Sequence, residues 1–96
     1  MTLEDVRRQA MAAVFEDKSV SPLEYSVYGA ILDNYTERDG RPCVLSNAEI
    51  GYMVGIHQST ASKAIRNLVR CGHLVTVTVS GLRLIRPSAW RYWPVK

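Results

Sequence analysis

Residues 47–68, NAEIGYMVGIHQSTASKAIRNL, decide the fold because they encode two helices joined by a very tight turn. Gly55 stands where a glycine usually follows the end of a helix, and Ile56 comes directly after it. An aliphatic side chain at that position is expected to fill the space between the two helices. The pattern therefore predicts one helix over residues 46–55 and another over residues 57–71.

The second of these helices has two unlike faces. Small and aliphatic residues recur at helical spacing on one of them: Ala61, Ala64, Ile65 and Leu68. The opposite side carries Gln58, Ser59, Ser62, Lys63 and Arg66, with Asn67 and Arg70 near its edges. The two small alanines predict a close crossing with the preceding helix. By composition alone, the polar side is most simply a solvated surface.

Strong start signals precede these helices. Ser46 or Asn47 can cap the first of them, and His57 sits at or beside the cap of the second. Further upstream, Ser21-Pro22-Leu23-Glu24 is a capping box with proline at the first helical position, which predicts a helix over residues 21–36. Its expected core stripe is Leu23, Val27, Ala30, Ile31 and Tyr35, flanked by Tyr28 and Leu32.

The chain begins with another amphipathic segment. Thr2 can cap it, and apolar residues at helical spacing predict a helix over residues 3–17. Such a helix can pack on the main body or pair two subunits, and both interpretations stay open at this stage.

A β-hairpin is predicted over residues 74–86. The two-residue loop Ser80-Gly81 separates two alternating segments. It pairs Val79 with Leu82 and Val77 with Leu84 on the side expected to be buried, and it pairs Thr78 with Arg83 and Thr76 with Ile85 on the other. Upstream, residues 43–45 are expected to form a brief strand against this hairpin. Residues 87–96 follow as an aromatic tail with Trp90, Tyr92 and Trp93, which can fold back on the helices, form a dimer interface or, less readily, contact bases.

Length and composition set the remaining bounds. Ninety-six residues with a net charge of +3 and a pI of about 9.1 predict one mildly basic domain, compatible with a nucleic-acid partner. With no secretory signal and no apolar run of membrane-spanning length, we expect a cytoplasmic protein with reduced Cys43 and Cys71. Their spacing to His57 and His73 matches no zinc finger. Neither a paired-acid nor a His-assisted nucleophile pattern occurs, nor a phosphate-binding glycine loop, so we expect no enzyme activity, cofactor or small-molecule ligand.

This order of elements resembles the winged helix-turn-helix domains of prokaryotic regulators and of plasmid and phage replication proteins. The resemblance covers residues 21–86 and rests on SPLEYSVYGAILDNY followed by GRPCVLSNAEIGYMVGIHQSTASKAIRNLVRCGHLV. His57 stands where that family usually has a serine cap, Ala61 where it usually has valine, and His73 adds one residue before Leu74. The resemblance implies a mainly α fold with a small β-hairpin wing and an extra N-terminal helix.

The resemblance also implies that residues 58–66 form a recognition helix in the major groove of double-stranded DNA. Gln58 would then pair with adenine and Lys63 or Arg66 with guanine, while Ser62 is small enough to allow close approach. Backbone N–H groups at the helix start, with the hydroxyls of Ser59 and Thr60, could hold a phosphate. The complete implied DNA-binding set is His57, Gln58, Ser59, Thr60, Ser62, Lys63, Arg66, Asn67, Arg70 and Arg83, with Arg41 as a weaker phosphate contact.

The simplest function implied is a small transcriptional repressor that occupies a promoter as a homodimer on a pseudo-palindrome. A plasmid or phage replication or maintenance factor is the alternative. A third reading is a winged-helix module that binds proteins instead of DNA.

Overall fold

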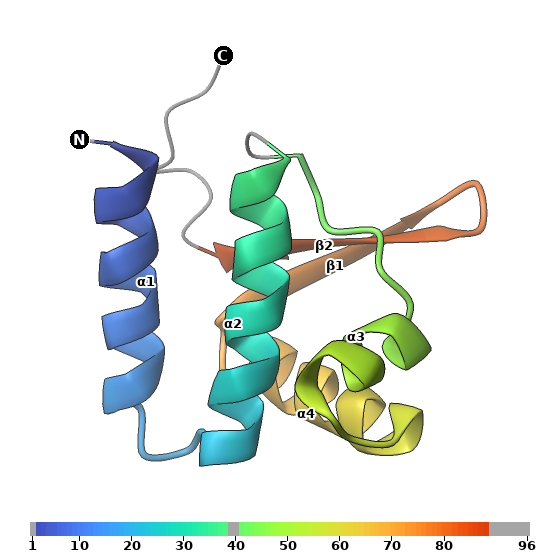
Figure 1. Ribbon diagram of the computed structural model, residues 1–96, viewed down its shortest axis with the longest axis horizontal. Coiled ribbons are helices and arrows are strands. Elements are labelled where there is room, and N and C mark those ends of the chain that lie inside the picture. The colour runs from blue at the N-terminus through green and yellow to red at the C-terminus, as the bar shows by residue number, and fades with distance from the viewer. Residues whose placement is uncertain (1, 39–40, 89–96) are drawn as a thin grey trace.

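The computed structural model describes residues 2–38 and 41–88 and contains four helices followed by a two-stranded antiparallel hairpin (Figure 1). The tail that sequence analysis singled out, residues 89–96, lies outside the described residues. The elements are α1 (Leu3–Glu16), α2 (Pro22–Glu37), α3 (Asn47–Val54), α4 (Gln58–Arg70), β1 (Leu74–Val79) and β2 (Leu82–Pro87). Each lies within two residues of its predicted limits.

The helices begin where their caps predict. Thr2, Ser21 and Ser46 each accept a hydrogen bond from the backbone N–H three residues on and complete a capping box. This settles the choice at the start of α3, because Ser46 is the cap and Asn47 is the first helical residue. His57 caps α4 through its side chain, as its position predicted.

The core is centred on α2. Figure 1 shows α1 and α2 side by side and antiparallel, with α3 and α4 below and beside them. Contacts join α2 to α1, α3, α4 and β2. On the α1 side, Val6, Ala10 and Val14 are buried, and the Arg7 guanidinium donates to Asp33 Oδ1 on α2 over 2.9 and 2.5 Å. The N-terminal helix therefore packs on the main body.

Contact on several sides changes which face of α2 is buried. Tyr28 and Leu32, predicted to flank the stripe, are fully buried, and burial raises the pKa of Tyr28 to about 12. Leu23, predicted to belong to the core, is exposed, and Ala30 is only partly buried. The expectation for Tyr28 and Leu32 was wrong because neighbours pack against more of α2 than one amphipathic stripe covers. The expectation for Leu23 was wrong because its side chain, in the first turn of α2, is not covered by the described residues.

The turn between α3 and α4 is as tight as predicted. Gly55 adopts a left-handed conformation with φ of 85°, and the Gly51 carbonyl accepts from the N–H groups of both Gly55 and Ile56 at 2.8 Å. A Cβ atom on Gly51 would lie 2.6 Å from the Ile56 carbonyl oxygen. The helix pair can therefore close this tightly only because residue 51 has no side chain.

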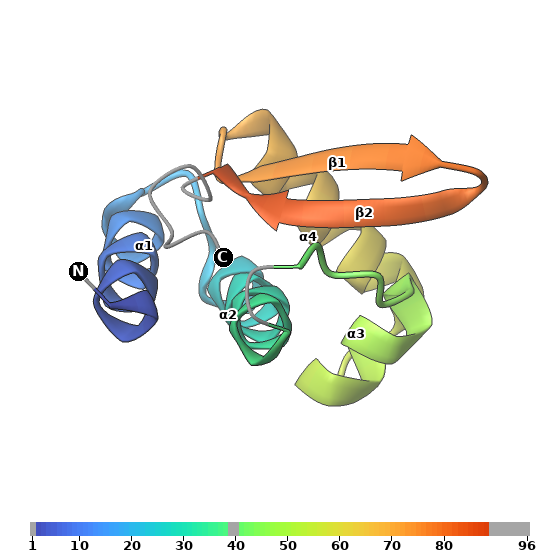
Figure 2. The ribbon, with the colours of Figure 1, turned by 90° about the horizontal axis from the view of Figure 1, so that it is seen from above.

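The hairpin has the predicted register. Val79 pairs with Leu82, Val77 with Leu84, Thr78 with Arg83 and Thr76 with Ile85. The segment after α2 joins it as expected, because Cys43 and Ile85 exchange two backbone hydrogen bonds of 2.8 and 2.9 Å. Figure 2 shows the turn of the hairpin projecting well beyond the helices.

The predicted burial of the hairpin was wrong. Val77, Val79 and Leu82, expected on the buried side, are each about half exposed, while Leu74 and Ile85 on the opposite side are buried. The helices reach only the base of the hairpin, and there the larger aliphatic residues Leu74 and Ile85 pack against the core. Because strand side chains alternate, burying this pair turns the valines outward.

Candidate functional site

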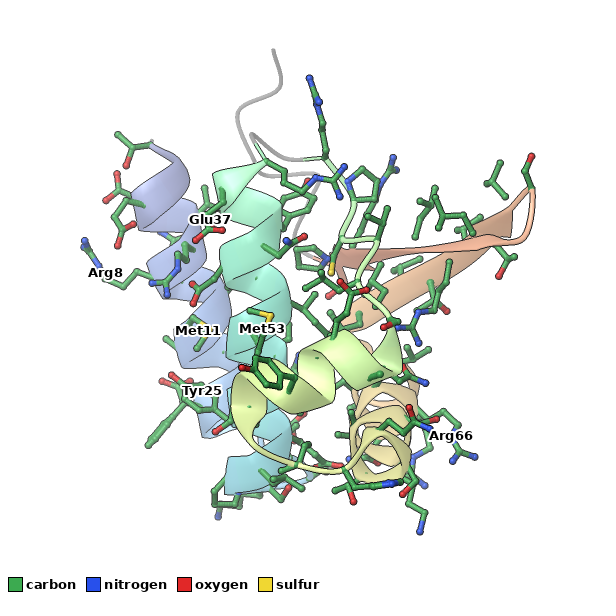
Figure 3. The ribbon with its side chains drawn as sticks, turned by 45° about the vertical axis from the view of Figure 1, so that its right-hand side comes forward. Arg8, Met11, Tyr25, Glu37, Met53 and Arg66 are labelled. Carbon is green, nitrogen blue, oxygen red and sulfur yellow. The ribbon has the colours of Figure 1, made fainter. Side chains whose placement is uncertain are left out.

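The outward side of α4 is a basic and polar surface. The helix contains no acidic residue, and Lys63, Arg66 and Arg70 follow one another at helical spacing. Both Lys63 and Arg66 are exposed, and neither has a hydrogen bond or ion pair within residues 2–38 and 41–88. Figure 3 shows Arg66 projecting from α4 on the side away from α1. Two full positive charges are thus available to an anionic partner.

The basic residues border a shallow hollow. It has a volume of about 380 Å³ and is lined by Lys63, Arg66, Asn67 and Arg70. The Arg70 guanidinium donates to Asn67 Oδ1, and Asn67 Nδ2 donates to the Ser19 carbonyl over 3.2 Å. These two residues therefore connect the C-terminal half of α4 to the loop between α1 and α2, whereas the Lys63 and Arg66 side chains have no such bond to the described part of the chain.

A second hollow lies where the N-terminal ends of α3 and α4 meet. Its volume is about 440 Å³, and small or polar residues line it: Ser46, Asn47, Ala48, Gln58, Ser59 and Ser62. Three of these, Gln58, Ser59 and Ser62, belong to the predicted binding set. Hydroxyl and amide groups can both donate and accept hydrogen bonds, so this hollow suits a partner that presents mixed donors and acceptors.

The start of α4 is organised by His57. Its Nδ1 accepts from the Ser59 backbone N–H over 3.1 Å and lies 2.8 Å from the Ser59 hydroxyl oxygen. The imidazole thus replaces the usual hydroxyl or carboxylate cap. Both residues are exposed, while Thr60 is partly buried. His57 and Ser59 form one unit at the entrance to the polar hollow.

Arg83 lies near the turn of the hairpin, as predicted, and its guanidinium is bonded to the chain itself. Its guanidinium donates to Asn47 Oδ1 over 2.6 Å and to the Leu45 carbonyl over 2.9 Å, and the side chain is partly buried. It reaches the rim of the polar hollow from β2 but is turned toward α3. The structure thus brings together the nine predicted residues on α4 and its cap, and it joins Arg83 to them through Asn47.

The sequence analysis missed Ser46 and Asn47 beside this surface and the exposed Tyr52 on α3. Ser46 and Asn47 line the polar hollow, and Tyr52 on α3 is 89% exposed. The pattern treated Ser46 and Asn47 only as alternative caps, although the one not used as a cap keeps its side chain for other contacts, and Asn47 accepts from Arg83. Tyr52 breaks the apolar spacing of α3, which was the available signal. Arg41, the weaker phosphate candidate, is exposed but lines neither hollow.

No protein-family model, curated protein or solved structure matches the chain. Within the described ranges, no helix is long and apolar enough to cross a membrane. The same residues contain no cluster of three or more His, Cys, Asp or Glu side chains that could hold a metal ion. Cys43 is buried and Cys71 partly buried, both as free thiols.

Proposed function

We propose that this chain is a winged helix-turn-helix protein that binds double-stranded DNA. In this proposal α3 and α4 are the helix-turn-helix pair, α4 is the recognition helix, and the β1–β2 hairpin is the wing. The observation that carries it is the acid-free outer face of α4, where Lys63 and Arg66 lie beside a polar hollow and pair with none of the described residues. Phosphates attract such cations without regard to sequence, while the polar groups of the hollow suit base edges.

Within this proposal the residues divide by role. Gln58, Ser62 and Arg66 read base edges, since they lie along the outer side of α4 from its start to its middle. Ser59 with its His57 partner sits at the helix start, where backbone N–H groups favour a phosphate. Asn67 and Arg70 border the duplex backbone at the far end. The simplest biological role is a small repressor that acts by occupying a promoter.

A protein-interaction module of the same fold is the second candidate. It is favoured by apolar side chains exposed on α3, where Tyr52 and Met53 are 89% and 54% exposed and help to line a hollow of about 360 Å³. DNA approaching α4 would leave much of that surface open.

One binding experiment separates the two. Fluorescence anisotropy with a random-sequence duplex at low salt should show binding at about micromolar protein that weakens steeply with added salt. Absence of binding under those conditions would reject the DNA proposal and favour the interaction module. Selection of bound sequences from a random pool should then return a preferred site, and a two-fold symmetric site would favour action as a dimer.

A further inference from the structure

Among the described residues, one edge of the hairpin has no partner strand. The sheet order is β1–β2, and the Cys43 bridge covers the far side of β2, so no residue in the described part of the chain pairs with the outer edge of β1. Ile85 directs its N–H and C=O to Cys43, which makes its pair with Thr76 a non-hydrogen-bonded one. The backbone groups of Thr76, and by alternation of Thr78, therefore point outward. Within residues 2–38 and 41–88 they have no hydrogen-bond partner.

This free edge lacks the features that usually prevent strand pairing. Natural proteins protect edge strands with charges, prolines or bulges. β1 reads LVTVTV and contains neither a charge nor a proline, and its register with β2 is continuous. β2 carries Arg83, Arg86 and Pro87, although it is already flanked on both sides at its base. The open edge of β1 therefore lacks the charges, prolines and bulges that usually block pairing with another strand.

The outward face of the same hairpin is apolar. Val75, Val77, Val79 and Leu82 are between 42% and 52% exposed. Together with Leu84 and Arg86, the three valines line a hollow of about 270 Å³ on this face. An apolar face next to an open edge is the arrangement that strand addition extends.

We propose that β1 pairs antiparallel with β1 of a second copy of this chain, about a two-fold axis at Val77. Residues 75–79 read VTVTV, which is the same in both directions. In this register Thr76 and the partner's Thr78 exchange two backbone hydrogen bonds, and the symmetric pair does the same. Every valine then lies opposite a valine on one face, and every threonine opposite a threonine on the other, both of them favourable cross-strand pairs.

The strength of the β1–β1 association depends on charge repulsion between the two copies and on the surface area that they bury. β1 brings no charge to the two-fold axis, and the arginines of the two β2 strands are kept about 14 Å apart by three strand spacings, beyond the screening length of about 8 Å in physiological salt. A six-residue edge buries less than the roughly 1,200 Å² of stable dimers. The dimer is therefore weak, with a dissociation constant on the order of 10–100 μM.

A disulfide experiment tests the register in the full chain carrying Cys71→Ser, since Cys43 is buried. Val77→Cys places a thiol on the two-fold axis, opposite its own copy, within reach of a disulfide. Val75→Cys is the matched control on the same face, because its copy lies about 13 Å away along the strand. Mild oxidation should produce covalent dimer from Val77→Cys and little from Val75→Cys. Equal yields from the two variants, or none from either, would overturn the proposal.

Sedimentation of the unmodified chain, without DNA, tests the association independently of the proposed function. The average mass should rise toward that of a dimer between about 1 and 300 μM. Thr76→Pro removes an N–H that the hairpin does not use, so it should weaken dimerisation at least about tenfold while leaving the far-UV circular dichroism unchanged. A chain that is monomeric throughout, or a Thr76→Pro variant that associates as the parent does, would reject strand pairing. Dimerisation that appears only after residues 89–96 are removed would also reject the proposal, because those residues, and not a second copy, would then cover the outer edge of β1 in the full chain.

Discussion

The Arg83 guanidinium on β2 donates to Asn47 Oδ1 at the start of α3 over 2.6 Å, and this contact fixes the hairpin against the helix pair. A second bond to the Leu45 carbonyl holds the same guanidinium in place. Arg83 therefore orients the proposed wing relative to α4, because α3 is packed directly against α4.

Comparison of Arg83→Ala with Asn47→Ala tests this positioning role. Both variants remove the Arg83–Asn47 hydrogen bond, which should lower the free energy of unfolding by about 1 kcal/mol, and Arg83→Ala should lower it further because it also removes the bond to the Leu45 carbonyl. Both should weaken DNA binding to a similar extent and leave its salt dependence unchanged, as measured by anisotropy at several salt concentrations. If Arg83→Ala alone reduces the slope of log binding constant against log salt concentration by about one unit, the guanidinium contacts a phosphate directly.

Arg66→Ala should weaken specific DNA binding by about 1–3 kcal/mol and leave the unfolding midpoint unchanged. The reason is that Arg66 is exposed and makes no hydrogen bond or ion pair with any residue that the structure describes. Arg8→Ala is the matched control, since Arg8 is an exposed cation on α1, far from Arg66 (Figure 3). Equal losses from the two variants would mean that only net charge matters, and α4 would lose its proposed role.

Two glycines in helices should respond oppositely to alanine. Gly51→Ala should destabilise the protein by about 2 kcal/mol, because the new Cβ would meet the Ile56 carbonyl oxygen at 2.6 Å. Gly29→Ala should stabilise it by up to about 1 kcal/mol, since alanine favours a helix and its nearest new contact is the flexible end of Met11 at 3.4 Å. Urea unfolding of both variants measures the difference. A neutral Gly51→Ala would show that the turn can relax.

The turn of the hairpin has positive φ at both central residues, 52° at Ser80 and 79° at Gly81. Such a turn prefers asparagine before glycine. Ser80→Asn should therefore raise the free energy of unfolding by about 0.5 kcal/mol, and Ser80→Val should lower it, because a β-branched residue resists positive φ. Thermal unfolding of the two variants should move the midpoint in opposite directions.

Acid should weaken the link between the end of α1 and the base of the hairpin. His73 Nε2 lies 2.6 Å from Asp17 Oδ2, and the hydrogen bonds from His73 and then from the Ser19 N–H lower the pKa of Asp17 below its ordinary value of 3.8. A carboxylate with a lowered folded-state pKa stabilises the protein above its unfolded-state pKa. That contribution is lost as the pH falls through the folded-state value.

Asp17→Asn should consequently reduce the fall in unfolding free energy between about pH 6 and about pH 2. Urea titrations at several pH values provide the measurement. Glu37→Gln is the control, because Glu37 is exposed and has no hydrogen bond or ion pair with the described residues. A pH dependence that both variants alter equally would remove the special role of Asp17.

The sequence predicted those features that neighbouring residues determine. Capping at Thr2, Ser21 and Ser46 depends on residues three positions apart, and the left-handed C-cap of α3 depends on the glycine at position 55. The pairing register of β1 and β2 could be predicted in the same way, because the two-residue loop Ser80-Gly81 determines it. The polar and apolar sides of α4 were also correct, because one strongly amphipathic helix defines both.

Features that depend on distant packing could not be predicted. Alternation in β1 was evident, but which side faces the core depends on how far the helices extend along the hairpin. The burial of Tyr28 required knowing that α2 has neighbours on several sides. Likewise, the partner of Arg83 lies 36 residues earlier in the chain, where no local pattern indicates it.

The backbone bridge between Cys43 and Ile85 has a consequence for the order of folding. It joins the segment just before α3 to the last strand of the described chain, so it encloses the whole helix pair in one closed loop. Long-range contacts of this kind form late, since closing a long loop costs chain entropy before any contact compensates for it. During synthesis, the helix pair can therefore assemble early, but the chain locks into its final shape only after Ile85 has left the ribosome.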